Sequence, residues 1–177
     1  MLSFKPNRLG AIAAALAMSS LIAVSGCQMR PLYATGPSGA AAVSQLIAIN
    51  EVTSRYAQEV RNHLIFLLNG GAGEPAEAVY KLELGVTKRV TNVASITPAT
   101  GESRGTAGAV VLASNYTISD AVTGSQVAAG SREITASFDR PAQQFALLRA
   151  ERDAEDRAAR ELAEALKLAI AADLADK

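Results

Sequence analysis

Cysteine, histidine and tryptophan are almost absent from this chain, and each scarcity excludes or disfavours particular kinds of bond or site. Its 177 residues contain one cysteine, one histidine and no tryptophan, and aromatic residues make up 5% of the total. A lone cysteine cannot form an intrachain disulfide, so we expect packing alone to stabilise the fold. The shortage of aromatic side chains disfavours a stacking platform for sugars or nucleotides.

Catalytic and metal-binding groups are equally scarce. His63 would have to serve any histidine-based triad, yet it lies next to Leu64 on the edge of an apolar helical face, where a packing role is expected. The glycines at 70, 71 and 73 lack the Lys-Ser or Lys-Thr pair that follows a phosphate-binding loop. No cluster of histidine and cysteine supports a transition-metal site. We therefore predict a protein that is not an enzyme, with no catalytic residues, no metal and no cofactor.

An uncharged apolar run precedes the one cysteine. Lys5 and Arg8 come before residues 9–24, which are rich in Ala, Leu, Ile and Val, and Val24-Ser25-Gly26-Cys27 follows. A basic start, a short apolar run and small residues before a cleavage point are typical of a secretory signal peptide. At about 16 residues the run is short for a helix that spans a membrane.

The end of this run resembles the lipobox of bacterial lipoproteins. The resemblance implies that residues 1–26 are a cleaved lipoprotein signal peptide, that Cys27 is lipidated, and that residues 27–42 form a lipidated tether. Two or more acyl chains hold a protein stably on a membrane. Gln28 stands where inner-membrane lipoproteins of enterobacteria carry Asp, which favours the outer membrane, periplasmic side. An ordinary signal peptide before a buried cysteine, or an uncleaved anchor, are the alternatives.

Charge is close to balanced. The chain has 17 basic and 17 acidic residues, and loss of residues 1–26 would leave 15 basic and 17 acidic residues among 151. That balance argues against a nucleic-acid partner. A mature chain of this length favours one domain, which we place at residues 43–177.

Hydrophobic periodicity predicts the order strand, helix, strand, strand, strand, helix in this domain. The apolar run at 43–52 fits a buried strand, and residues 55–69 repeat apolar side chains at helical spacing, with Thr53 or Ser54 as the N-cap and Gly70 as the stop. Alternation then predicts three strands, from Val79 to Val90 or Val93, through 110–118, and through 126–138. Gly130 within the third of these indicates a bulge or a close backbone approach.

The C-terminal third predicts one long helix. Asp139 is placed to cap it and Pro141 falls in its first turn. The apolar stripe expected to be buried consists of Phe145, Leu148, Leu162, Leu166 and Ile170. Ion pairs four residues apart are expected for Arg152–Asp156, Asp153–Arg157, Asp156–Arg160 and Arg160–Glu164. The fold class is therefore α+β, a two-layer sandwich in which a four-stranded mixed sheet is covered by two helices on one face.

Several segments together resemble a known family. They are Arg30-Pro31-Leu32-Tyr33 after the cysteine, Val60-Arg61-Asn62-His63-Leu64 in the first helix, and Phe138-Asp139-Arg140-Pro141 before the last helix. With the order of strands and helices, they resemble the lipopolysaccharide-assembly lipoprotein family LptE in its alphaproteobacterial form. The resemblance implies a two-layer fold of four strands and two helices. It also implies a non-enzymatic protein inside the outer-membrane barrel LptD, which helps that barrel assemble and contacts lipopolysaccharide.

The same resemblance points to two basic residues for lipopolysaccharide binding, Arg104 in the loop between the second and third strands and Arg149 early in the last helix. Arginine forms bidentate, charge-assisted bonds with phosphate. Lys88, Arg89 and Arg132 would join Arg104 on one sheet face if the strand register allows it. Two other functions stay open: an auxiliary envelope lipoprotein of a lipid-transporting ABC system, and a cell-wall hydrolase that uses carboxylates.

Overall fold

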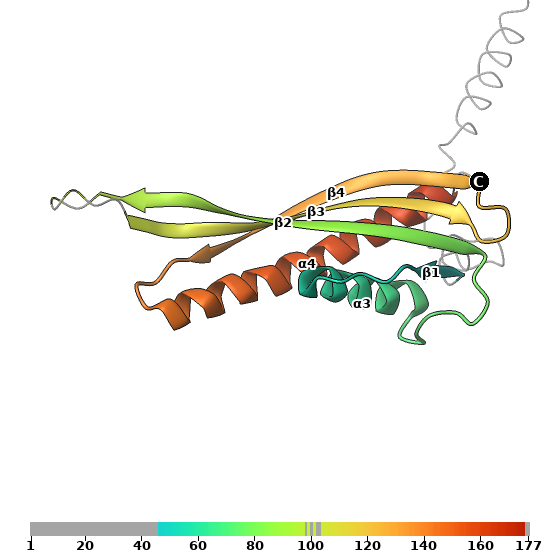
Figure 1. Cartoon of the computed structure of the whole chain (residues 1–177), viewed down its shortest axis with the longest axis horizontal. Coiled ribbons are helices and arrows are strands. Elements are labelled where there is room, and N and C mark those ends of the chain that lie inside the picture. Colours follow the sequence, from blue (N-terminus) through green and yellow to red (C-terminus); the bar gives the residue numbers. More distant parts are fainter. Residues whose placement is uncertain (1–45, 98, 100, 102–103, 176–177) are drawn as a thin grey trace, which may run out of the picture. The chain divides into compact units, whose positions relative to one another are not determined.

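Two helices and four strands make up the described part of the chain, which in this computed structural model comprises residues 46–97, 99, 101 and 104–175. The signal peptide, Cys27, the tether at 27–42 and residues 43–45 of the expected first strand lie outside the described residues. The elements are β1 (Ile47–Ile49), α3 (Arg55–Asn69), β2 (Tyr80–Ile96), β3 (Arg104–Asp120), β4 (Gln126–Asp139) and α4 (Gln144–Ala175) (Figure 1).

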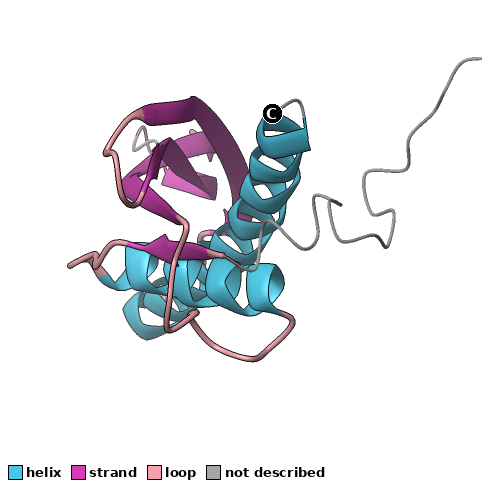
Figure 2. Cartoon of the chain, turned by 90° about the vertical axis from the view of Figure 1, so that its right-hand side faces the viewer, coloured by secondary structure: helices cyan, strands magenta, loops and turns pink. Residues whose placement is uncertain are grey.

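The strands form one mixed sheet in the order β1-β2-β3-β4, in which β1 is parallel to β2 and the other pairs are antiparallel. Helix α4 packs along β3 and β4, and α3 packs against α4 and the β1–β2 side of the sheet. Both helices lie on the same side of the sheet (Figures 1 and 2). The predicted α+β two-layer fold is confirmed.

The core lies between the sheet and the helices. Alternation places every second residue of β2 and β3 toward the helices, and the helical spacing of α3 and α4 turns their apolar faces toward the sheet. The core-facing side chains with no exposed surface include Ile47, Leu82, Val110, Leu112 and Ile118 from the sheet and Val60, Leu64, Leu162, Leu166 and Ile170 from the helices. The buried stripe predicted for the last helix is thus confirmed in its second half.

The outer side of β1 is closed by side chains. Glu74 accepts a hydrogen bond from the Ile49 N–H at 3.1 Å, and Arg61 of α3 donates to the Ile49 and Asn50 carbonyls at 3.0 and 2.9 Å. Arg61 and Glu74 also form an ion pair at 2.9 Å. These bonds satisfy the backbone groups that a further strand would otherwise use.

Helix α3 begins and ends as the sequence predicts. Ser54 is its N-cap residue with an extended backbone, although its hydroxyl makes no capping hydrogen bond. Gly70 adopts φ 58° after the last helical residue, a left-handed conformation that glycine accepts without steric cost.

The start of α4 differs from the prediction. Asp139 is the last residue of β4, paired with Ala107, and the Arg140 N–H donates to the Thr106 carbonyl at 2.9 Å. These pairings keep the chain extended, so Asp139 does not cap the helix and Pro141 lies in the connection before Gln144.

The predicted burial of Phe145 and Leu148 is wrong. Their exposed fractions are 86% and 57%, because they lie in the first turns of α4, beyond the start of α3. Of the four predicted ion pairs, Asp153–Arg157 forms at 3.1 Å, whereas Asp156 pairs with Arg55 of α3 at 2.7 Å.

Gly130 is a site of close approach, one of the two alternatives that the sequence left open. It is paired with Tyr116, and a Cβ at Gly130 would lie 2.5 Å from the Tyr116 hydroxyl. The missing side chain lets the Tyr116 ring lie flat across β4, so that its hydroxyl donates to Asp173 Oδ2 of α4 at 2.7 Å.

This bond predicts an alkaline pH dependence of stability. Burial, together with the hydrogen bond to Asp173, raises the pKa of Tyr116 from 10.0 to about 12. The protonated hydroxyl therefore stabilises the fold fully below pH 10, and that contribution is lost as the pH rises toward 12. In urea unfolding at several alkaline pH values, we expect the stability advantage of wild type over Tyr116→Phe to shrink across this interval, by at most about 2 to 3 kcal/mol. A constant difference between the two proteins would contradict the assignment.

Candidate functional site

A pocket of about 290 Å³ lies between β2 and the first turns of α4. It joins cationic and apolar side chains in one place, which makes it the candidate functional site. Its lining consists of Lys88 from β2 and Phe145, Leu148, Arg149, Glu151, Arg152 and Glu155 from α4.

An ion cluster around Glu155 forms the inner end of this pocket. The Glu155 side chain is 8% exposed and lies 2.8 Å from Lys88 Nζ and 3.0 Å from Arg55 Nη2. The hydrogen bond that Lys88 donates to Glu155 raises the pKa of Lys88, and the hydrogen bond that Arg55 donates to Asp156 raises the pKa of Arg55. Because these partners come from β2, α3 and α4, the cluster fixes where the two helices meet the sheet. A buried carboxylate with two cationic partners has little capacity left for a ligand.

The outer end of the pocket carries exposed cationic side chains. Within the described residues, the side chains of Arg149 and Arg152 have no hydrogen bond or ion pair. Both are exposed, and they follow directly on the exposed Phe145 and Leu148. The pocket mouth therefore offers two free guanidinium groups beside apolar surface, an arrangement that suits an anionic or amphiphilic partner.

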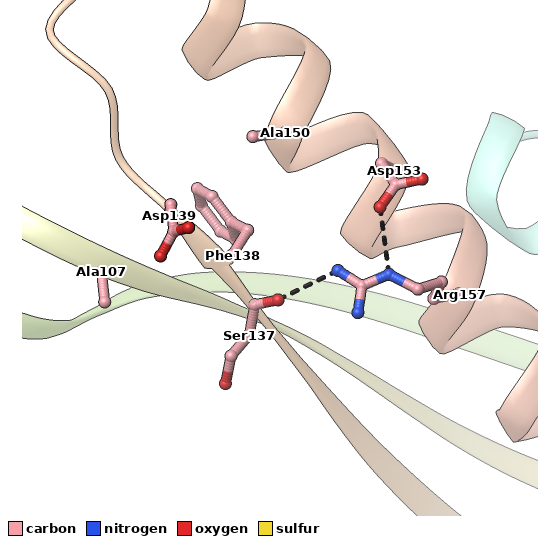
Figure 3. Close-up of a pocket in the computed structure, with 7 residues that line it drawn as sticks. All are labelled: Ala107, Ser137, Phe138, Asp139, Ala150, Asp153 and Arg157. Carbon is pink, nitrogen blue, oxygen red and sulfur yellow. Dashed lines mark hydrogen bonds and ion pairs between the residues drawn. The ribbon is translucent and has the colours of Figure 1, made fainter.

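A second pocket, of about 360 Å³, lies on the other flank of α4, against β4 (Figure 3). Its one cation, Arg157, is occupied: Nε binds Asp153 at 3.1 Å and Nη2 donates to the Ser137 carbonyl at 3.0 Å. Asp139 also lines this pocket. Since its carboxylates outnumber a cation that is already paired, this pocket is the poorer site for a phosphate.

Arg104 does not lie in the loop between the second and third strands, where it was predicted. It is the first residue of β3 and pairs with Ile96. The β2–β3 hairpin continues beyond the last β3–β4 pair, Ala107–Asp139, and α4 begins five residues after Asp139. The hairpin and the start of α4 lie at the same end of the sheet (Figure 1), so Arg104 and Arg149 come from neighbouring regions of the fold.

The possible basic sheet face does not form. Lys88 points to the helices and is paired with Glu155, whereas Arg89, the next residue, points to the opposite face. Arg132 pairs with Ser114 on the helix side and donates to the Ser131 carbonyl. Alternation thus separates Lys88 from Arg89, and strand β3 lies between Lys88 and Arg132.

Two site residues were missed or misassigned from sequence. Arg152 was expected to pair with Asp156, but the long-range contact of Asp156 with Arg55 leaves Arg152 free. Glu155 carried no signal of burial, because all residues from Glu151 to Arg157 except Ala154 are charged. His63, expected to pack at a boundary, is 34% exposed and lies 3.3 Å from Glu59.

A metal site and a membrane-spanning helix are both absent from the part of the chain that the structure describes. There, His, Cys, Asp and Glu side chains form no group that could hold a metal ion. Among the same residues, no helix is both long and apolar enough to cross a membrane.

Comparison with known proteins identifies relatives of this fold. The family model LptE, described as lipopolysaccharide-assembly, matches residues 44–170. No curated protein matches the sequence.

Solved structures resemble the domain at low sequence identity. A lipoprotein from Caulobacter crescentus CB15 is 23% identical with a TM-score of 0.63, over 80% of this chain and 100% of that chain. Rare lipoprotein B from Shewanella oneidensis is 14% identical with a TM-score of 0.52, over 71% and 92%. A minor lipoprotein from Acinetobacter baumannii is 15% identical with a TM-score of 0.51, over 71% and 88%. At these identities the likeness shows a shared fold.

Proposed function

This chain belongs to the LptE family of lipopolysaccharide-assembly proteins, and from that premise we propose that it is a non-enzymatic outer-membrane lipoprotein on the periplasmic side. In this proposal it occupies the lumen of an LptD-type β-barrel, helps that barrel assemble, and contacts lipopolysaccharide on its way to the outer leaflet. The observation that carries the proposal is the family match over residues 44–170.

The surface of the domain is compatible with a place inside a barrel. The interiors of large outer-membrane barrels are polar, so a protein within one needs a polar surface. The helix-free face of the sheet meets this need with side chains such as Thr87, Asn115, Thr117, Ser131 and Thr135. The nearly balanced charge of the chain avoids strong repulsion from a lumen of either sign.

We assign the lipopolysaccharide contact to Arg149 and Arg104. Arg149 has a free guanidinium at the pocket mouth, and Arg104 begins β3 at the same end of the sheet. Lipid A carries phosphate groups, with which a guanidinium forms two parallel charge-assisted bonds. Arg152, beside Arg149 in the pocket lining, is a third candidate for the same chemistry.

Charge reversal tests this contact. We expect Arg104→Glu combined with Arg149→Glu to reduce crosslinking of the purified barrel complex to lipopolysaccharide by about tenfold or more. Each charge-assisted bond contributes about 1.5 to 3 kcal/mol, and 1.4 kcal/mol is a factor of ten in binding. The amount of barrel protein recovered with the double variant should stay near that of wild type, because a large protein interface spreads over many contacts.

Arg160→Glu is the matched control, because Arg160 is an exposed arginine of the same helix outside the pocket. Equal crosslinking by the double variant and wild type would remove Arg104 and Arg149 from the site. If the wild-type protein in mild detergent brought down inner-membrane transporter components and no barrel, the ABC-system alternative would replace the present proposal.

A further inference from the structure

Side chains bind the backbone along parts of two edges of the sheet. On the outer edge of β1, Arg61 and Glu74 bind the backbone of Ile49. On the outer edge of β4, Arg132 donates to the Ser131 carbonyl at 2.7 Å and Arg157 to the Ser137 carbonyl at 3.0 Å. Proteins block exposed strand edges in this way because free edges pair with other chains.

The middle of β2 is a third edge, and it is open. Strand β1 pairs with Tyr80–Leu82 only, after which the Asn50 side chain accepts the Leu84 N–H at 2.7 Å. Alternation then turns the backbone N–H and C=O groups of Val86, Lys88 and Val90 away from β3. Within the described residues, no strand pairs with this side of β2 after Leu82.

The charge that would protect this edge is already paired. An inward-pointing lysine discourages strand pairing, but the ammonium of Lys88 is neutralised by Glu155 at 2.8 Å. The segment from Val86 to Ile96 has no acidic residue and no proline, and it is rich in β-branched side chains. Its remaining charge is Arg89 on the helix-free face.

The helix layer is incomplete beside the same edge. Helix α3 begins at Arg55, next to Asp156, so it leaves the earlier turns of α4 uncovered. In Figure 1, β1 and α3 lie together, away from the end where α4 begins. Lys88, Phe145 and Leu148 line one pocket, so a strand added beside β2 would bring its helix-facing side chains onto the exposed Phe145 and Leu148.

We propose that the open edge of β2 from Val86 to Val90, with Phe145 and Leu148 beneath it, binds an extended segment of the barrel protein as an additional strand. The segment is apolar on its helix-facing side and carries carboxylates that meet Arg89 or Arg152. A second copy of this chain fits poorly, because edge pairing would bring two basic segments together. The identity of the partner rests on the proposed function; the open edge does not.

Hydrogen exchange in the purified complex of the full chain with its barrel protein tests the proposal. Backbone amides that join a strand ladder are protected. We expect the amides of Val86, Lys88 and Val90 to exchange at least about tenfold more slowly in the complex than in the free chain. Unchanged exchange in a complex that does form would overturn this proposal and leave the proposed function intact. Failure of wild type to form any complex with the barrel would overturn both.

Proline at the edge supplies an independent test. Val90→Pro removes an outward N–H without removing a bond to β3, since proline is tolerated at strand edges. We expect it to lower the amount of barrel protein recovered about tenfold, whereas Val90→Ala, which keeps the N–H, and Thr135→Pro, on the opposite edge, should leave recovery near wild type. Equal recovery by all three would overturn the proposal. Slowed exchange that depends on the concentration of the isolated chain would identify a second copy as the occupant, which also overturns it.

Discussion

Leu162→Ala is expected to lower the free energy of unfolding by about 2 to 5 kcal/mol, the range for truncating a buried leucine. Leu162 has no exposed surface and lies where α4 packs on the sheet. The substitution removes buried methyl groups and leaves a cavity that rigid neighbours fill incompletely. Urea denaturation followed by circular dichroism measures the change. In a domain of this size, such a loss is a large part of the total stability.

Two leucines of the same helix are matched controls. Leu168 and Leu148 are 51% and 57% exposed, and each change to alanine should cost less than about 0.5 kcal/mol. Leu148 is the more informative, because hydrophobic periodicity alone predicts it to be buried. A cost for Leu148→Ala equal to that for Leu162→Ala would show that the start of α4 is packed after all.

Cys27→Ser is expected to abolish lipid attachment. A serine hydroxyl is a much weaker nucleophile than a thiolate, so it does not take up the lipid group that Cys27 accepts, and lipid-coupled cleavage depends on that step. We expect the variant to accumulate as the precursor of about 18.3 kDa and to incorporate no labelled palmitate, whereas wild type incorporates the label and is shortened. Each buried methylene contributes about 0.8 kcal/mol to membrane binding, so loss of two or more acyl chains removes stable anchoring.

Met29→Ser, two residues further along, is the control and should be processed like wild type. Mass spectrometry of the mature N-terminus gives the decisive measurement. An unmodified first residue other than Cys27 would favour one of the alternatives, an ordinary signal peptide or an uncleaved anchor.

Local patterns predicted those elements whose ends are set by local chemistry. Helix α3 has a strong apolar period and ends at Gly70, whose positive φ stops a helix regardless of the surroundings. Strand β2 follows from strict alternation around Leu82 and Leu84. Gly130 was recognised as unusual, and the structure shows that it makes room for the Tyr116 ring.

Tertiary contacts decided the elements that were predicted incorrectly. Asp139 and Pro141 form a sound helix start by local rules, but pairing of Asp139 with Ala107 and of Arg140 with Thr106 holds the chain extended. Periodicity gives the direction of a helical face but not the length of the layer that covers it. Phe145 and Leu148 continue the apolar stripe of α4, but they lie beyond the start of α3, which therefore does not cover them.

The candidate site depended on the same long-range information. The family resemblance points to Arg149, whereas Arg152 becomes available only because Asp156, its expected partner, pairs with Arg55. Alternation along β2 is enough to place the adjacent residues Lys88 and Arg89 on opposite faces of the sheet. Residue spacing could not show that Lys88 would pair with Glu155, because that contact depends on how α4 packs on the sheet.

The bonds on both sides of β1 determine how the domain resists mechanical force. If Cys27 holds the chain on a membrane, tension reaches the described part of the domain at Leu46, whose carbonyl accepts the N–H groups of Val79 and Tyr80 at 2.9 and 3.1 Å. The residues of β1 that follow pair with β2 on one side, and on the other side Arg61 and Glu74 bind the backbone of Ile49. Pulling the tether must therefore break bonds on both sides of β1 together, in shear, before the domain can be unravelled from its anchored end.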